Sequence, residues 1–245
     1  MFCWTDDMIS FMQDAANFSS YQKELADWIC GALPAVRHVC DAGCGLGFLS
    51  VRLAERFETV TAADISGQAL ANLHRMAAEK NVSNLEILET DMMTFTPEAP
   101  YDAMVFCLFG RMREILRVAK RCCAGEIVVV KKAFTHHRFS VSSVPLRDEV
   151  TEQAADFLRA QGVPFQLETK TFDMGQPLRS LDDAVRFFEI YSKDAPGTIT
   201  RETVLPRLRE TGDDVFPYYL PQERHWGGLQ LIPRTFRRNY YDTVI

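Results

Sequence analysis

The chain has 245 residues, of which 47% are hydrophobic and 24% are charged, and this balance excludes a largely disordered protein. The formal net charge of −6 argues against a nucleic-acid-binding protein, which normally presents a basic face. No apolar run approaches the roughly 20 residues that cross a bilayer, and the first residues are acidic where an export signal would be basic. Two short basic clusters, within 131–138 and 234–238, are interpreted as solvated surface. We therefore expect a cytoplasmic protein with no membrane partner, and the charge disfavours a nucleic-acid partner without excluding one.

Seven cysteines, an odd number, are typical of free thiols in a reducing compartment rather than of a disulfide framework. Cys40, Cys107, Cys122 and Cys123 lie in or beside predicted core strands. Cys40 and Cys44 are spaced like two metal ligands, but no second Cys or His pair completes such a site. We expect no bound metal.

The predicted elements alternate between helices and strands through the first 133 residues. Residues 21–33 repeat apolar residues at helical spacing, and Pro34 ends that helix. The elements that follow are a strand over 36–42, a helix over 46–57, a strand over 59–64, a helix over 67–80, strands over 85–90 and 101–109, a helix over 111–123 and a strand over 125–132. This spacing predicts right-handed β-α-β units and a mostly parallel sheet.

The second half of the chain is less regular. We predict a helix over 146–162, a strand over 165–174, a helix capped by Ser180, a helix from Thr200 to about Arg209, and a final strand over 227–233. A helical insertion, residues 178–213, therefore separates the last two strands.

The strongest chemical signal is the segment VCDAGCGLG, residues 39–47. A strand ends at Asp41, and Gly43, Gly45 and Gly47 then turn the chain into a helix. Glycine suits a turn where backbone approaches a ligand closely or adopts a positive φ. Open parallel sheets bind ligands at the carboxyl ends of their strands, so we expect a ligand site at this turn.

Two more acids end the next two predicted strands. Asp64 lies 23 residues beyond Asp41, where a carboxylate can accept hydrogen bonds from both hydroxyls of a ribose. Asp91 ends the third strand, where a carboxylate and nearby backbone can meet an adenine edge. Three unrelated surface acids are the plainer interpretation, but their order behind a glycine turn favours a cofactor that contains adenosine.

The segment DAGCGLG, Asp64 and Asp91 together resemble the successive cofactor motifs of class I S-adenosylmethionine-dependent methyltransferases, a Rossmann-like family. The resemblance extends over residues 36–133. It implies an α/β fold with a doubly wound, seven-stranded, mostly parallel sheet of order 3-2-1-4-5-7-6, the last strand antiparallel.

The same resemblance implies one methyltransferase domain over residues 1–245. Within it, we expect an N-terminal helical cap over 1–35, a cofactor-binding core over 36–133, and the insertion over 178–213 as a lid on the acceptor side. The implied contacts of S-adenosylmethionine are Gly43, Cys44 and Gly45 at the methionine part with Asp41 nearby, Asp64 at the ribose, Ile65 on the adenine, Asp91 and Met92 at the adenine edge, Cys107 beside the methionine, and Tyr21 closing over the cofactor or packing as an ordinary aromatic.

A dinucleotide-binding dehydrogenase is the natural rival, but its G-x-G-x-x-G pattern fails here. The third glycine would fall on Phe48 or on Ser50. Within the methyltransferases, the segment VFCLFG (105–110) lacks the Asp/Asn-Pro-Pro-aromatic turn of enzymes that methylate adenine or glutamine amides.

The acceptor is less readable than the cofactor. The insertion is expected above the active site, with Phe187, Phe188 and Tyr191 either lining the acceptor pocket or packing the insertion onto the sheet. Candidate bases are His136, His137 and His225, because histidine titrates near neutrality, and we prefer His136; an amine or thiolate acceptor would need none.

We predict methyl transfer to a small-molecule acceptor. A protein or RNA methyltransferase, and a catalytically silent S-adenosylmethionine-binding sensor or partner subunit, are the alternatives.

Overall fold

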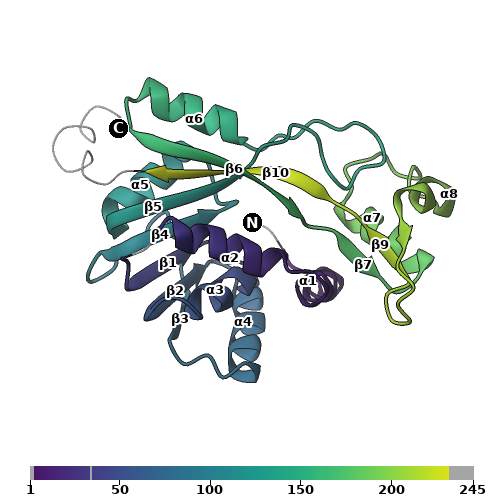
Figure 1. Cartoon of the computed structure of the whole chain (residues 1–245), viewed down its shortest axis with the longest axis horizontal. Helices are drawn as coiled ribbons and strands as arrows, with labels where there is room; N and C mark the ends of the chain where they lie inside the picture. The colour runs from purple at the N-terminus through teal and green to yellow at the C-terminus, as the bar shows by residue number, and fades with distance from the viewer. Residues whose placement is uncertain (1–2, 34, 232–245) are drawn as a thin grey trace.

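The computed structural model describes residues 3–33 and 35–231, and its centre is a twisted seven-stranded sheet (Figure 1). The strand order is β3-β2-β1-β4-β5-β10-β6. The strands are β1 (His38–Ala42), β2 (Thr59–Asp64), β3 (Leu85–Glu89), β4 (Tyr101–Cys107), β5 (Cys123–Lys132), β6 (Phe165–Asp173) and β10 (Glu223–Leu231). Neighbouring strands from β3 to β5 are parallel, whereas β10 is antiparallel to both β5 and β6. Since β10 is the seventh strand of this sheet along the chain, the predicted order and the antiparallel last strand are confirmed.

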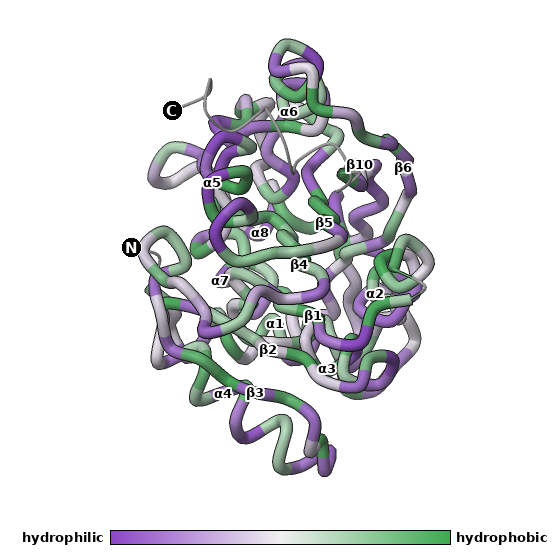
Figure 2. Tube along the Cα trace, turned by 90° about the vertical axis from the view of Figure 1, so that its left-hand side faces the viewer, coloured by the Kyte–Doolittle hydropathy of each residue, from purple (hydrophilic) through white to green (hydrophobic). Residues whose placement is uncertain are grey.

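Helices cover both faces of the sheet. One face packs against α2 (Tyr21–Gly31), α3 (Phe48–Ala54) and α4 (Gly67–Glu79), and the other against α5 (Met112–Cys122) and α6 (Thr151–Ala160). The near-continuous apolar run of β4 explains this layering, because alternate residues enter opposite cores: Ala103 and Val105 face α2 and α3, whereas Met104 and Phe106 face α5 and α6. Figure 2 shows hydrophobic residues concentrated in the central strands β4 and β5.

The segment between β6 and β10 was predicted as helical, and this was only partly right. It contains α7 (Leu181–Tyr191), α8 (Arg201–Val204) and a 3-10 turn over Leu205–Arg207, but also a three-stranded sheet of β7 (Gln176–Leu178), β9 (Tyr218–Leu220) and β8 (Arg209–Glu210). The helix expected to reach Arg209 ends at Val204, because Pro206 cannot continue it.

An N-terminal helix, α1 (Asp6–Phe18), lies within the helical cap expected over 1–35, although no separate helix was predicted before residue 21. It begins at Thr5, whose side chain accepts a hydrogen bond from the Met8 backbone N–H. Figure 1 shows α1 between the main sheet and the inserted elements. Pro34, expected to end α2, lies outside the described residues.

The last strand begins four residues earlier than predicted, at Glu223. Its glycines are therefore internal to the strand: a Cβ on Gly227 would lie 2.0 Å from Thr151 Cγ2, and a Cβ on Gly228 would lie 2.7 Å from the Trp28 ring. Residues 232–233 of the predicted strand and the basic cluster 234–238 lie outside the described residues. No helix in the described part of the chain is long and apolar enough to cross a membrane.

Candidate cofactor and acceptor site

The glycine turn after β1 has the left-handed backbone that its sequence requires. Gly43, Gly45 and Gly47 have φ angles of 74°, 56° and 79°. A Cβ on Gly43 would lie 2.4 Å from Phe109 Cδ2, so a side chain there would be strained for two reasons. The backbone N–H groups of Gly43 and Cys44 both donate to the Ala63 carbonyl, at 2.8 and 3.0 Å, and these bonds tie the turn to the end of β2.

Asp64, the last residue of β2, is bound to the same turn. Its Oδ2 accepts from the Gly45 N–H at 2.8 Å, and its Oδ1 accepts from the Ser66 N–H at 2.9 Å. A carboxylate offers about four acceptor positions. Asp64 can therefore hold the turn and still accept hydrogen bonds from two hydroxyl groups of a ligand.

Asp41 lies beneath the turn rather than on its surface. The residue is 1% exposed, and its Oδ2 accepts a 2.6 Å hydrogen bond from Ser50 Oγ. Burial raises the pKa of Asp41 to about 6, against the lowering effect of the Ser50 hydrogen bond. This position makes Asp41 a support for the turn rather than a direct ligand contact.

Apolar side chains are exposed beyond the carboxyl ends of β2, β3 and β4. Ile65 directly follows β2, Met93 lies four residues after β3 and Leu108 directly follows β4, with exposed fractions of 46%, 39% and 45%. Exposed apolar residues that share one sheet edge suit a flat heterocycle. Leu108 also has a φ of 58°, a strained value for a branched residue, at the point where β4 meets this edge.

The two remaining expected adenine contacts differ in accessibility. Asp91 is exposed, and its Oδ1 accepts from the Met93 N–H at 2.8 Å. Met92 is 3% exposed and its side chain belongs to the core under α5, so only its backbone can meet a ligand. Cys107 is half-buried at the end of β4, and burial raises its pKa far above the usual thiol range.

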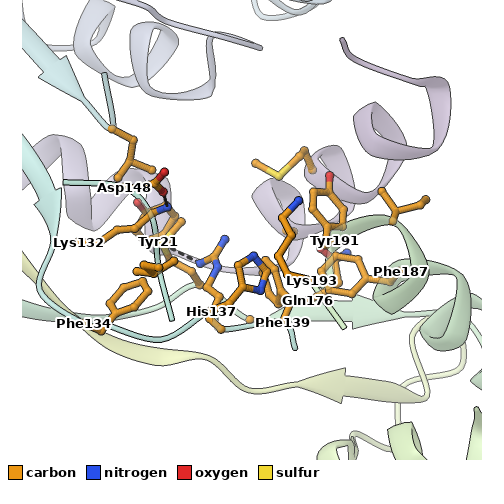
Figure 3. Close-up of a pocket in the computed structure, with 18 of the residues that line it drawn as sticks. Tyr21, Lys132, Phe134, His137, Phe139, Asp148, Gln176, Phe187, Tyr191 and Lys193 are labelled. Carbon is orange, nitrogen blue, oxygen red and sulfur yellow. Dashed lines mark hydrogen bonds and ion pairs between the residues drawn. The ribbon is translucent and has the colours of Figure 1, made fainter. Parts of the chain in front are cut away.

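A cavity of about 840 Å³ extends from Leu108 and Tyr21 to the inserted elements (Figure 3). Tyr21, 7% exposed, packs edge-on against Phe172 with ring centroids 5.6 Å apart. The far wall is aromatic and includes Phe139, Phe187 and Tyr191. The centroids of Phe187 lie 4.8 Å from Phe139 and 4.7 Å from Tyr191. Phe188, also considered as lining, is fully buried in the insertion's own core.

The structure separates the three candidate histidines. His136 is exposed, its ring is 3.0 Å from Thr135 Oγ1, and it does not line the cavity. His225 was expected before the final strand, but it lies within β10, where its ring is 2.8 Å from Thr171 Oγ1, and it too is outside the cavity lining.

His137 is the histidine that lines the cavity. Its Nδ1 is 3.1 Å from Ser140 Oγ, which also accepts the Lys193 backbone N–H at 2.9 Å. Burial lowers the pKa of His137, and the nearby cations lower it further, so the imidazole is neutral at pH 7. No residue in the described part of the chain bonds to Nε2, which is free to accept a proton when Nδ1 carries the hydrogen.

The interpretation of the cluster 131–138 as solvated surface was wrong for Lys131, His137 and Arg138, whereas His136 is exposed. Lys131 is 3% exposed: its Nζ donates to the Phe109 carbonyl at 3.2 Å and to the Gly110 carbonyl, and lies 3.2 Å from Glu149. The position of the cluster was the missed signal, because it lies at the carboxyl end of the buried strand β5, at the edge where ligands bind.

Comparison with known proteins finds a family match for the part of the chain that contains the glycine turn, Asp64 and Asp91. Residues 39–126 match a family model described as "Methyltransferase domain". These residues are similar to a methyltransferase domain. The match favours the methyltransferase expectation over the dehydrogenase alternative.

A curated relative matches a part of the chain of similar length. It is YqeM of Bacillus subtilis (strain 168), named as a methyltransferase, and it is 34% identical over 84 residues. The alignment covers 33% of this chain and 32% of that relative, so the chain matches about a third of the relative's length.

Solved structures match the methyltransferase domain and its surroundings in fold. The YcgJ protein from Bacillus subtilis has a TM-score of 0.54 at 12% identity, over 86% of this chain and 98% of that one. Coclaurine N-methyltransferase, solved with N-methylheliamine and SAH, has a TM-score of 0.50 at 14% identity, over 86% and 72%. The [4+2]-cyclase SpnF has a TM-score of 0.50 at 18% identity, over 86% and 80%.

The methyltransferase domain and the cavity divide along the sequence. The glycine turn, Asp64 and Asp91 lie within the matched residues, whereas Tyr21, His137 and the aromatic wall lie outside them. The family model therefore covers the glycine turn and the acids, and most of the cavity lining lies outside it.

Proposed function

We propose that the chain is an S-adenosylmethionine-dependent methyltransferase that methylates a small molecule held in the cavity beyond Leu108. The observation that supports the proposal is that the sheet edge beside the glycine turn is continuous with the cavity. Leu108 belongs both to that apolar edge and to the lining of the cavity. An acceptor in the cavity would thus lie next to a cofactor at the turn.

The residues at the sheet edge fit this cofactor. Gly43 and Gly45 expose backbone for the methionine part, Asp64 retains acceptor positions for the ribose hydroxyls, and Ile65 offers an apolar surface to the adenine. The remaining proposed contacts are Cys44 and Cys107 beside the methionine, Asp91 and the Met92 backbone at the adenine edge, and Tyr21 over the cofactor, with Asp41 supporting the turn from below.

S-adenosylmethionine supplies an electrophilic methyl group, and the attacking atom must approach in line with the bond that breaks. The aromatic wall of Phe139, Phe187 and Tyr191 would orient the acceptor, and Tyr21 would exclude water where cavity and cofactor meet. We assign proton removal to His137 Nε2 rather than to His136 or His225, because His137 alone of the three lines the cavity.

The cavity favours a small acceptor over the two alternatives. Its volume of about 840 Å³ is within the range of small-molecule sites, roughly 300–1,000 Å³. A silent cofactor-binding protein would need no such space beyond the methyl group. A protein or RNA substrate would bind an open surface rather than an enclosed aromatic wall.

The test is calorimetric titration of the full chain with S-adenosylmethionine and, separately, with NAD. We expect micromolar binding of S-adenosylmethionine, no binding of NAD, and about a tenfold or greater loss for Asp64→Ala, since a bidentate ribose contact disappears. Glu98→Ala, which removes an exposed acid outside the site, is the matched control. Binding of NAD alone, or equal affinities for the two variants, would overturn the cofactor assignment.

A further inference from the structure

The cavity is positively charged, although the chain as a whole carries a net charge of −6. Its charged lining residues are Lys132, Arg138, Arg147, Asp148 and Lys193. Lys132 and Asp148 form an ion pair with each other. For the other three, no carboxylate lies within 4.0 Å among residues 3–33 and 35–231. A concave site with an excess of one sign attracts a ligand of the opposite sign.

Arg138 is the half-buried member of this set, whereas Arg147 and Lys193 are exposed to solvent. Its guanidinium carbon lies 4.1 Å from the centroid of the Phe139 ring, and its Nη1 lies 3.2 Å from Met174 Sδ. A thioether is a weak acceptor, and a guanidinium has five N–H donors. The described structure therefore leaves most of the hydrogen-bonding capacity of Arg138 for a ligand.

The charge of Arg138 is not neutralised by its neighbours. Burial, with a smaller effect of Arg224, lowers its pKa to about 10, so the guanidinium is still charged at pH 7. Tyr21 could compensate this charge only as a phenolate, but burial raises the pKa of Tyr21 well above its usual value. A partly desolvated, unpaired cation is unfavourable unless an anion joins it.

A second arginine fixes the backbone that carries Arg138. Arg207 donates to the Arg138 carbonyl at 3.2 Å and to the Ser140 carbonyl. Burial lowers the pKa of Arg207, Arg224 lowers it as well, and Asp194 raises it. The two hydrogen bonds from Arg207 therefore hold the Arg138 backbone in place at the cavity wall.

The shape of the site indicates what kind of anion fits. A planar guanidinium fork matches the two oxygens of a carboxylate. Much of the surrounding wall is apolar, because Met8, Met12 and Phe134 line the cavity together with the aromatic residues. A single guanidinium in a largely apolar wall suits a ligand that has one negatively charged group and is otherwise apolar or aromatic.

We propose that the methyl acceptor is a small, largely apolar molecule that carries a carboxylate, and that Arg138 binds this carboxylate. The inference rests on the proposed function, because it assigns the substrate class of the same cavity. Arg138 is the specificity residue, and His137 beside it in the chain is the group that takes the acceptor's proton.

The test uses matched probes on the full chain saturated with S-adenosylhomocysteine. Phenylacetate, phenylpropionate and phenylbutyrate are titrated by calorimetry, each beside its primary amide, and phenylethylphosphonate is the phosphate-like probe. At least one carboxylate should bind on the order of tenfold more tightly than its amide, because only the carboxylate pairs with the fork. Arg138→Met should abolish this preference, and Arg138→Lys should restore part of it.

Arg117→Met is the control, since Arg117 is an exposed arginine of α5 outside the cavity lining, and it should keep the preference. Three results would overturn the inference: equal binding of acids and amides, no binding of any carboxylate, or a preference that survives Arg138→Met. Tighter binding of the phosphonate would overturn the carboxylate assignment in favour of a phosphate-bearing acceptor. Circular dichroism checks that each variant is folded. Binding of S-adenosylhomocysteine, recorded on the same samples, tests the proposed function separately from the acceptor class.

Discussion

At the scale of single residues, the site is organised by the cost of burying charge. His137 is neutral because burial lowers its pKa first, and Lys193, Lys132 and Arg138 lower it further, whereas Asp194 raises it. A neutral imidazole surrounded by cations is a proton acceptor whose protonated form is disfavoured. Its working range therefore extends to lower pH than that of an ordinary histidine.

Lys193→Met should raise the pKa of His137, because it removes the largest cationic contribution. The imidazole then protonates at a higher pH, and any activity that needs it as a base falls off earlier as the pH is lowered. NMR titration of the His137 ring proton measures this directly and needs no acceptor. His136, which is exposed and outside the cavity, is the internal reference in the same spectra. An unchanged His137 titration would contradict the electrostatic account.

At the scale of elements, two adjacent lysines of β5 have opposite roles. The Lys131 ammonium is buried against the loop after β4 and beside Glu149, which in turn accepts the Met112 N–H at the start of α5 at 2.7 Å. The Lys132 ammonium pairs with Asp148, whose side chain is 62% exposed. One lysine therefore joins three segments below the cavity, and the other forms a solvent-screened pair.

Lys131→Met should lower the free energy of unfolding by about 3 kcal/mol, because it leaves Glu149 and two carbonyl groups without their cation. Lys132→Met should cost less than about 1 kcal/mol, as exposed ion pairs do. Urea denaturation followed by circular dichroism compares the two variants. Similar losses for both would show that burial does not distinguish them.

The elements also show where sequence patterns suffice. The strands from β1 to β5 were predicted because their short apolar runs alternate along the chain with segments of helical periodicity. The glycine turn and Asp64 were predicted because each lies within a few residues of a strand end, so a local pattern suffices to recognise them. The strands β7, β8 and β9 have two or three residues each, too few for an alternating pattern to register. Arg138 could not be recognised as a cavity residue, because the cavity is assembled from segments as distant as Met8 and Trp226.

At the scale of the whole molecule, two helices far apart in the chain, α1 and α7, pack against each other beside the cavity. Phe11 of α1 packs edge-on against Phe187 of α7, with ring centroids 5.2 Å apart, and the Gln176 side chain donates to the Phe11 carbonyl at 3.0 Å. Arg179 pairs with Asp14, and Arg186 donates to Asp7 at 2.8 Å. The helix α1 is thus part of the cavity wall, and we expect α7 to need it to enclose the cavity.

This arrangement predicts that acceptor enclosure can be weakened without loss of cofactor binding. Phe11→Ala should cost about 3 kcal/mol of stability and should lower hydrogen-exchange protection in α1 and α7 together, because each helix covers the other. Affinity for S-adenosylhomocysteine should stay within about threefold, since Phe11 is absent from the sheet edge where Asp64 and the glycine turn lie. Phe18→Ala, which removes a 41% exposed ring of the same helix, is the control and should leave α7 protected. If exposure after Phe11→Ala were confined to α1, α7 would be stable alone, and the enclosure of the acceptor would not depend on the two helices together.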